Sequence, residues 1–329
     1  LSIPIGYGEL ICVSKRQNIL FFSTKQNMCL TSYNLTTKEI KSEFRVPSII
    51  TAAIIVGGRL LIIGGSDCSV RVWDLYTRKQ ISNSGFHASY ITSIGACYDN
   101  GLLVSLDKDS VLVFETLIDH KFITSISLNT IIDGLKKMKQ INNDSNLQIG
   151  VDSEPNAIPL ALHSNDFETL FNNYKHIENI MRKEDDFQFD EDDLFVPQIA
   201  VFRSGIVCVS QKTFLIFFDS HGKVITIKKL NGTFNDMKKY YDFDTREFLI
   251  VGTKPKNIEL IDLTTFLPFA RIEVYNYRFY PIKNTRSILI SSHNELHVYS
   301  FANFIPPIIM NYQENEIPPI PLLKKHQAQ

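Results

Sequence analysis

Apolar and polar positions alternate in short runs along most of this chain, and turns rich in Gly, Asn, Asp and Lys separate the runs. The clearest example is Ile49–Val56, the turn Gly57-Gly58 and Leu60–Ile63. Two adjacent glycines accept the positive φ angles of a tight hairpin turn. Asn100-Gly101 is a second hairpin signal between two further apolar runs. The pattern therefore predicts many short antiparallel strands.

Several of these runs end in an apolar or aromatic residue followed by a polar one. The pairs are Tyr33-Asn34, Trp73-Asp74, Phe114-Glu115, Phe218-Asp219, Ile261-Asp262 and Tyr299-Ser300. Successive pairs are 40, 41, 104, 43 and 38 residues apart. Three of these spacings fall within the period of about 40–45 residues of a four-stranded propeller blade, and the spacing of 38 is close to it. Trp73-Asp74 is the ending of a WD-type repeat, so we expect an all-β, WD-repeat-like β-propeller.

Six four-stranded blades are visible, and residues upstream of Leu1 would complete a seventh. Blades 1–3 occupy residues 1–128 and blades 4–6 occupy residues 197–312. All four strands are recognisable in the first four blades. The fifth and sixth blades show three strands each, namely Phe248–Val251, Ile258–Ile261 and Ala270–Val274, then Ser287–Ile290, Leu296–Tyr299 and Ile305–Met310.

Residues 129–196 have a different pattern, which indicates an insertion. Asn165-Asp166-Phe167-Glu168 resembles a capping box and precedes one apolar stripe at helical spacing, so we expect an amphipathic helix over Asp166–Lys183. This helix would cover a blade edge or dock a partner. Alternatively, Lys136–Gln140, Leu147–Val151 and Ile158–Leu162 form a degenerate extra blade. The proline-containing tail, residues 313–329, is not a sheet strand.

An acidic run follows the expected helix. Its members are Asp185, Asp186, Asp190, Glu191, Asp192 and Asp193. The run lacks the glycine and the regular ligand spacing of a calcium loop. It is therefore either a solvated charge run or a regulatory segment.

A regular WD repeat contains a hydrogen-bonded set formed by His, Ser or Thr, Asp and the Trp indole. In the second blade Asp67 and Trp73 match this set and Asp74 completes the WD ending, but Gly64 replaces the Ser or Thr and no His precedes Ile49. The third blade has His87 and Ser105, with Phe114 in place of Trp. No blade has the whole set, so we expect stability to rest mainly on apolar packing between blades.

The order of these motifs resembles the C-terminal WD-repeat propeller of BEACH-domain proteins, the beige and neurobeachin group. The matching stretches are Gly64–Leu75, 87–94, Gly101–Phe114, Val196–Ile225 and Ile258–Pro268. The resemblance implies a non-enzymatic protein-interaction scaffold in vesicle and membrane trafficking. It also implies a cytoplasmic protein, peripheral on vesicle membranes, with a BEACH domain upstream. The chain begins at Leu1 without Met, and we expect it to be a C-terminal piece of a longer protein.

Composition narrows the function further. The 34 basic and 35 acidic residues give a formal charge of −1, which argues against non-specific electrostatic binding to nucleic acid. No apolar run reaches the roughly 18–20 residues that span a bilayer. The five cysteines are scattered without a Cys-x-x-Cys pair, which indicates reduced thiols rather than disulfides or a zinc site; they are Cys12, Cys29, Cys68, Cys97 and Cys208.

No motif identifies catalytic residues, a metal site or a cofactor site. The alternative to a scaffold is a propeller-shaped hydrolase that uses the central channel. Such an enzyme needs acidic, His or Arg side chains at the inner strand ends, and the inner strands here are chiefly Ile, Val, Leu and Ala.

One side of the blades carries the candidate binding surface. In this architecture the turns between second and third strands emerge on the same side as the connections between blades. These turns carry Lys25, Lys108, Lys212, Lys254 and Lys256, and we name these five residues the lysine rim. The acidic run belongs to a connection on that side. We therefore expect the rim to bind other proteins, through acidic peptides, or anionic lipid headgroups, with the acidic run competing in cis.

Overall fold

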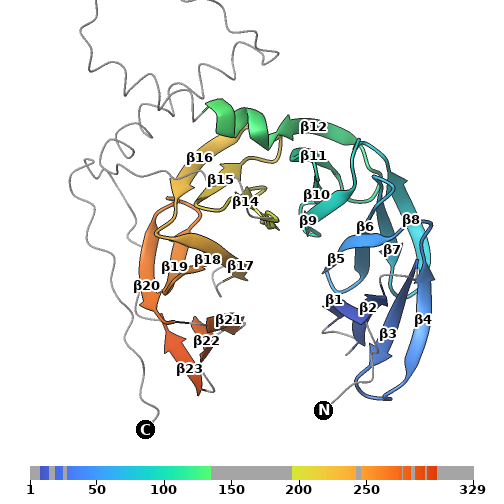
Figure 1. Cartoon of the computed structure of the whole chain (residues 1–329), viewed down its shortest axis with the longest axis horizontal. Coiled ribbons are helices and arrows are strands. Elements are labelled where there is room, and N and C mark those ends of the chain that lie inside the picture. Colours follow the sequence, from blue (N-terminus) through green and yellow to red (C-terminus); the bar gives the residue numbers. More distant parts are fainter. Residues whose placement is uncertain are drawn as a thin grey trace, which may run out of the picture. The chain divides into compact units, whose positions relative to one another are not determined.

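A computed structural model describes residues 8–14, 19–24, 28–134, 195–241, 246–275, 277–282, 286–292 and 295–301 (Figure 1). These residues form 23 strands, and residues 128–134 are helical. The strands make five four-stranded sheets and one three-stranded sheet. In every sheet the neighbours follow one another in the sequence, so each sheet is an antiparallel meander. Each sheet corresponds to one blade.

The strand bounds are as follows. The first blade contains β1 (Gly8–Ser14), β2 (Ile19–Thr24), β3 (Cys29–Asn34) and β4 (Ile40–Arg45). The second contains β5 (Ile50–Val56), β6 (Leu60–Gly65), β7 (Val70–Asp74) and β8 (Lys79–Ser84). The third contains β9 (Ile91–Cys97), β10 (Leu102–Asp107), β11 (Val111–Thr116) and β12 (Phe122–Ser127).

The remaining blades follow residue 195. The fourth contains β13 (Ile199–Val201), β14 (Val207–Ser210), β15 (Phe214–Phe218) and β16 (Val224–Lys229). The fifth contains β17 (Thr233–Tyr241), β18 (Glu247–Lys254), β19 (Asn257–Asp262) and β20 (Pro268–Glu273). The sixth contains β21 (Tyr277–Ile282), β22 (Ser287–Ser292) and β23 (Glu295–Ser300).

Contacts group the chain into two compact units. The first comprises Leu1–Thr92, Val104–Asp186 and His221–Lys223, and the second comprises Ser93–Leu103, Phe187–Ser220 and Val224–Gln329. The first unit has an apolar core between the first two blades, in which Phe21 and Leu30 pack with Leu61 and Ile63, all at most 1 % exposed. Removing these side chains from water is the main favourable term in folding.

The second unit has two apolar clusters. One joins the fourth and fifth blades, where Phe202 and Phe217 pack with Leu249 and Val251. The other joins the fifth and sixth blades and is rich in rings. Among its members, Tyr240, Phe248, Phe269 and Phe301 have ring centroids 5.2 to 6.3 Å apart. Neighbouring sheets in this unit are therefore held by side chains of the strands that face each other.

The strands expected in the first four blades are confirmed, and so are the later strands of the fifth and sixth blades that fall on described residues. The first strands of the last two blades, β17 and β21, were missed. The reason is that polar side chains interrupt both strands, so neither has a clean apolar run. Ile305–Met310, Asp166–Lys183, the three segments of the alternative extra blade and the tail lie outside the described residues.

The hairpin signals are confirmed by backbone geometry. Gly57 and Gly58 have φ angles of 61° and 69°, which a tight turn of the I′ kind requires, and Arg59 N donates to Val56 O at 3.1 Å. Gly101 has a φ of 66°. These turns end the first strand and begin the second in their blades.

The polar residue that ends three of the third strands caps the turn that follows. Asn34 Oδ1 accepts bonds from Thr36 N and Thr37 N at 2.8 and 3.1 Å. Asp74 Oδ1 accepts from Tyr76 N and Thr77 N at 2.8 and 3.0 Å. Asp262 Oδ1 accepts from Thr264 N at 3.3 Å. The recurring pair seen in the sequence is thus a turn-capping device.

Within individual blades, the turn between the second and third strands is bonded to the connection that leads in or out of the blade. Lys108 N donates to Tyr90 O at 3.0 Å, and Val274 N donates to Lys256 O at 2.8 Å. In the fourth blade, Leu230 N of the outgoing connection donates to Thr213 O of the β14–β15 turn at 2.8 Å. In these blades the two kinds of loop therefore lie on the same side of their sheet.

Candidate functional site

The third blade contains a buried polar group at the end of β10. His87 Nε2 lies 2.8 Å from Ser105 Oγ, and its Nδ1 lies 3.1 Å from Asp107 Oδ2. All three residues are buried, and Asp107 also accepts a bond from Val111 N at 2.9 Å. The structure therefore places His87 between Ser105 and Asp107. Each member is held by the others, which makes the group structural.

The second blade also contains a hydrogen-bonded polar cluster, built from different residues around Asp67. Asp67 accepts bonds from Ser48 Oγ and Ser69 Oγ, both at 2.8 Å, and Arg71 binds both of its carboxylate oxygens. The hydrogen bond from Arg71 is the largest cause that holds the pKa of Asp67 well below its usual range. Ser48 and Arg71 were missed, although Arg71 is only four residues from Asp67; Ser48 is 19 residues away.

The glycine that makes room for this cluster is Gly65. A Cβ at Gly65 would collide with Ser48 Oγ and Asp67 Oδ1. Gly64, the residue to which the sequence assigned this position, precedes it in the same strand and so faces the other side of the sheet. The assignment of Gly64 is therefore wrong by one residue.

Trp73 is partly buried and packs against the core of the first two blades, beside Leu61 and Leu75. Asp74 is buried, caps its turn and accepts a bond from Arg59 Nε at 2.7 Å. Both residues hold the second blade together.

A buried carboxylate joins the second and third blades. Glu115 is fully buried, accepts a bond from Ser84 Oγ at 3.1 Å and lies 2.9 Å from His120 Nδ1. Glu115 occupies the position that Asn34 and Asp74 hold in their blades. Its side chain is longer than theirs and binds Ser84 of β8 rather than the following turn. Thr116 Oγ1 caps the turn, accepting from Lys121 N at 2.8 Å. The sequence showed Glu115 as a weakened repeat ending and did not reveal this contact.

The second unit contains a polar cluster at the turns between first and second strands. Arg203 Nε lies 2.5 Å from Asp99 Oδ2, and its guanidinium lies 4.6 Å from the Tyr241 ring centroid. Glu247 accepts bonds from Arg203 N and Ser204 N at 2.6 and 3.0 Å. This cluster ties the fourth and fifth blades to the β9–β10 turn.

Lys239 of β17 extends this network inward. Its ammonium donates to Val201 O at 2.8 Å and to Ala96 O at 3.4 Å. Burial lowers the pKa of Lys239 and raises the pKa of the Tyr241 hydroxyl. The expectation that inner strands are chiefly aliphatic is therefore wrong for β17, and also for β21, which carries Arg278.

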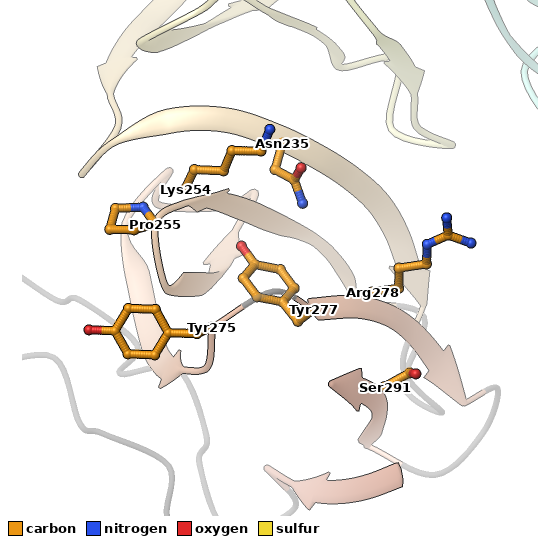
Figure 2. A pocket seen from close by; sticks show the side chains of 7 residues that line it. All are labelled: Asn235, Lys254, Pro255, Tyr275, Tyr277, Arg278 and Ser291. Atoms are coloured by element: carbon orange, nitrogen blue, oxygen red, sulfur yellow. The ribbon is translucent and has the colours of Figure 1, made fainter. Parts of the chain in front are cut away.

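A pocket of about 570 Å³ lies between the fifth and sixth blades (Figure 2). It is lined by Asn235, Lys254, Pro255, Tyr275, Tyr277, Arg278 and Ser291. Figure 2 shows Lys254 extending toward Asn235, while Tyr277 lies between Pro255 on one side and Arg278 and Ser291 on the other. Its size is in the range of small-ligand and peptide side-chain pockets.

The turn that carries Lys254 is firmly held. Tyr277 Oη lies 2.9 Å from Thr253 O and 2.6 Å from Asn257 O, so its hydroxyl can donate to either carbonyl. Asn257 Nδ2 donates to Asn231 O at 3.2 Å. Burial raises the pKa of Tyr277, which keeps the hydroxyl a donor. Gly252 lets Tyr277 approach, because a Cβ there would come within 2.8 Å of its hydroxyl oxygen.

The lysine rim is only partly brought together. Lys254 and Lys256 flank Pro255 in one turn, where Lys256 Nζ lies 3.3 Å from Glu273 Oε2 and 5.9 Å from the Tyr275 ring centroid. Lys212 lies in the β14–β15 turn. Lys108 is exposed, with its ammonium 5.6 Å from the Tyr90 ring centroid. Lys25 and the whole acidic run fall outside the described residues.

In the part of the chain that the structure describes, no group of three or more His, Cys, Asp or Glu side chains could hold a metal ion. No described helix is long and apolar enough to cross a membrane. Cys68, Cys97 and Cys208 are free thiols.

Comparison with known proteins identifies the fold and nothing finer. No family model and no curated protein matches the chain. In contrast, 1559 chains of solved structures match it, so the fold is a common one. One belongs to "Crystal Structure of Mitotic Checkpoint Complex", with a TM-score of 0.56 and 10% identity over 98% of this chain and 76% of that chain. Together with the sheet order, this likeness establishes an all-β, WD-repeat-like β-propeller fold.

Proposed function

We propose that this chain is a non-enzymatic protein-interaction scaffold. The observation that carries the proposal is the division of its polar groups. Asp67, His87 and Glu115 each bind side chains of their own polar group. In contrast, the exposed Lys254 and Arg278 face a pocket. Cross-partnered groups favour a structural role, and exposed cations beside aromatic rings favour partner binding.

The cellular setting is the finer part of this proposal. The stretches Gly64–Leu75, Val196–Ile225 and Ile258–Pro268 resemble the C-terminal propeller of BEACH-domain proteins, which supports a role in vesicle and membrane trafficking on the cytoplasmic side. A fluorescent fusion of the chain is expected to gather on vesicles. Uniform distribution that persists when vesicle number is raised would count against this setting.

The scaffold role is tested by using the purified chain as bait. We expect it to retain a reproducible set of proteins, and to lose them when the second-to-third-strand turns around Lys108, Lys212 and Lys254 are scrambled. The matched control scrambles residues 35–37 and 76–78, in turns between third and fourth strands. Equal retention by both variants would contradict a binding surface on the lysine rim. Hydrolysis of a common ester, peptide or phosphate substrate would instead support the propeller-shaped hydrolase.

The acidic run is proposed as a competitor for the same lysines. Deleting residues 184–193 should raise affinity for an acidic peptide at low salt, and the gain should fade as salt screens the contact. Equal affinity of the intact and deleted proteins at low salt would dispose of this regulation.

A further inference from the structure

The pocket between the fifth and sixth blades presents two cations that have no counterion among the described residues. Lys254 and Arg278 are both exposed, and no described acidic side chain forms an ion pair with either. The nearby acids are occupied elsewhere, because Glu273 pairs with Lys256 at 3.3 Å and Asp236 pairs with Lys238 at 2.9 Å. The lining residues include no Asp or Glu. The pocket is therefore locally positive in a chain of net charge −1.

Further donors line the same space. Asn235 offers a side-chain amide and Ser291 a hydroxyl, and both are only partly buried. An amide and a hydroxyl beside two cations match the acceptor oxygens of a carboxylate or a phosphate. The two cations would attract an anion, and the amide and hydroxyl donors would orient it.

The site needs little rearrangement to bind. The Thr253–Asn257 turn is held by the Tyr277 hydroxyl at 2.9 and 2.6 Å, and Val274 N donates to Lys256 O at 2.8 Å. Gly232 also packs against this turn. It has a φ of 129° and lies so close to Lys254 O that a Cβ would collide with it. A turn fixed before binding loses less conformational entropy when a ligand arrives.

The surroundings favour a peptide over a membrane. Tyr275 is 57 % exposed, and its ring and the exposed Pro255 offer apolar faces beside the cations. Such faces suit peptide side chains. Attachment to an anionic membrane usually takes clusters of about four to eight Lys or Arg, and two cations in a recess fall short of that.

We propose that this pocket binds an acidic peptide segment of a protein partner, with its carboxylates or phosphates on Lys254 and Arg278 and an apolar neighbour against Tyr275 and Pro255. The proposal rests on the scaffold function and names the chemistry of its partner. Charge selects the segment, and the fixed turn sets its position.

The test is a fluorescence-anisotropy titration at low salt with labelled pentapeptides. The probes are Glu-Glu-Phe-Glu-Glu, a version with phosphoserine at one glutamate, and a version with Gln at every glutamate. We expect the two anionic peptides to bind and the Gln peptide not to bind. The variant K254Q/R278Q should bind the anionic peptides roughly tenfold more weakly or worse, because two charge-assisted contacts are lost.

The matched control is K79Q/R246Q, which removes two exposed cations elsewhere and should keep wild-type affinity. Equal weakening in both double variants would show non-specific attraction and overturn the proposal. So would failure of every anionic peptide to bind the wild-type chain. Phosphatidylcholine vesicles with and without phosphatidylserine form a separate arm, in which binding to vesicles alone would favour the lipid.

Failure of the scaffold function gives a different result. If the wild-type bait retains no protein, the scaffold function fails. If the wild-type bait retains partners and K254Q/R278Q retains them equally well, the scaffold function stands and the pocket proposal falls.

Discussion

The polar clusters of the second and third blades differ from the pocket of the fifth and sixth blades in how their polar atoms are used. In the second and third blades, Asp67 and His87 bind side chains of their own blade. In the pocket, Lys254 and Arg278 have no described ion-pair partner and face open space. Partnered groups stabilise a fold, and groups left available bind ligands. Variants in the two regions should therefore affect different measurements.

Trp73→Ala is expected to have the largest effect on stability. Trp73 packs against the core of the first two blades but is only partly buried. We expect a loss of about 3 kcal/mol, at the lower end for such truncations. Urea unfolding measures it, with Tyr76→Ala, at an exposed neighbouring position, as the control. An unchanged midpoint would mean that the packing assigned to β7 is wrong.

His87→Ala should cost nearly as much, about 2–3 kcal/mol, because it leaves Ser105 and Asp107 buried without their shared partner. Ser125→Ala, which removes an exposed hydroxyl from β12 of the same blade, should stay within about 0.5 kcal/mol. Similar losses in both variants would show that burial of the His87 group does not matter.

Arg71→Met should cost about 1–2 kcal/mol at neutral pH, a modest figure because the Asp67 side chain is 35 % exposed. Since Arg71 holds the pKa of Asp67 below its ordinary value of 3.8, the contribution is present above that pH. It is lost as the pH falls toward the lowered pKa. Unfolding at pH 7 and pH 3 should show the two proteins converging in acid, and a constant difference would contradict the pairing.

Tyr277→Phe is expected to lower both the stability of the protein and its affinity for an acidic peptide slightly. It removes the hydroxyl that holds the Lys254 turn, so we expect a loss of about 1 kcal/mol in stability and weaker binding of an acidic peptide. Tyr275→Phe is the control, because it removes an exposed tyrosine hydroxyl and keeps the ring. Full affinity in Tyr277→Phe would show that the turn needs no such support.

Much of this fold was predictable because the blades repeat local signals. Glycine pairs, alternating runs and the polar residue after each third strand located the strands of the first four blades. These signals depend on a few neighbouring residues, which the chain order displays directly. The strands β17 and β21 lacked them, because Lys238, Lys239 and Arg278 interrupt the apolar pattern.

The candidate site was less predictable for the same reason. Asn235, Tyr277 and Arg278 come from the two missed strands, so only Lys254 of the pocket had been singled out. The contact between Glu115 and Ser84 joins residues 31 positions apart, and no spacing rule indicates it. Tertiary contacts, rather than local propensity, decide where these side chains meet.

The smallest effect on stability is expected for K254Q/R278Q. Unfolding and anionic-peptide affinity of this variant, measured on the same samples, separate the two roles of the polar groups. Exposed, unpaired cations should contribute less than about 0.5 kcal/mol to folding. We expect an unchanged unfolding midpoint together with roughly tenfold weaker peptide binding. A variant that binds the peptide as the wild type does, or that loses stability as His87→Ala does, would contradict the division between partnered and available polar groups.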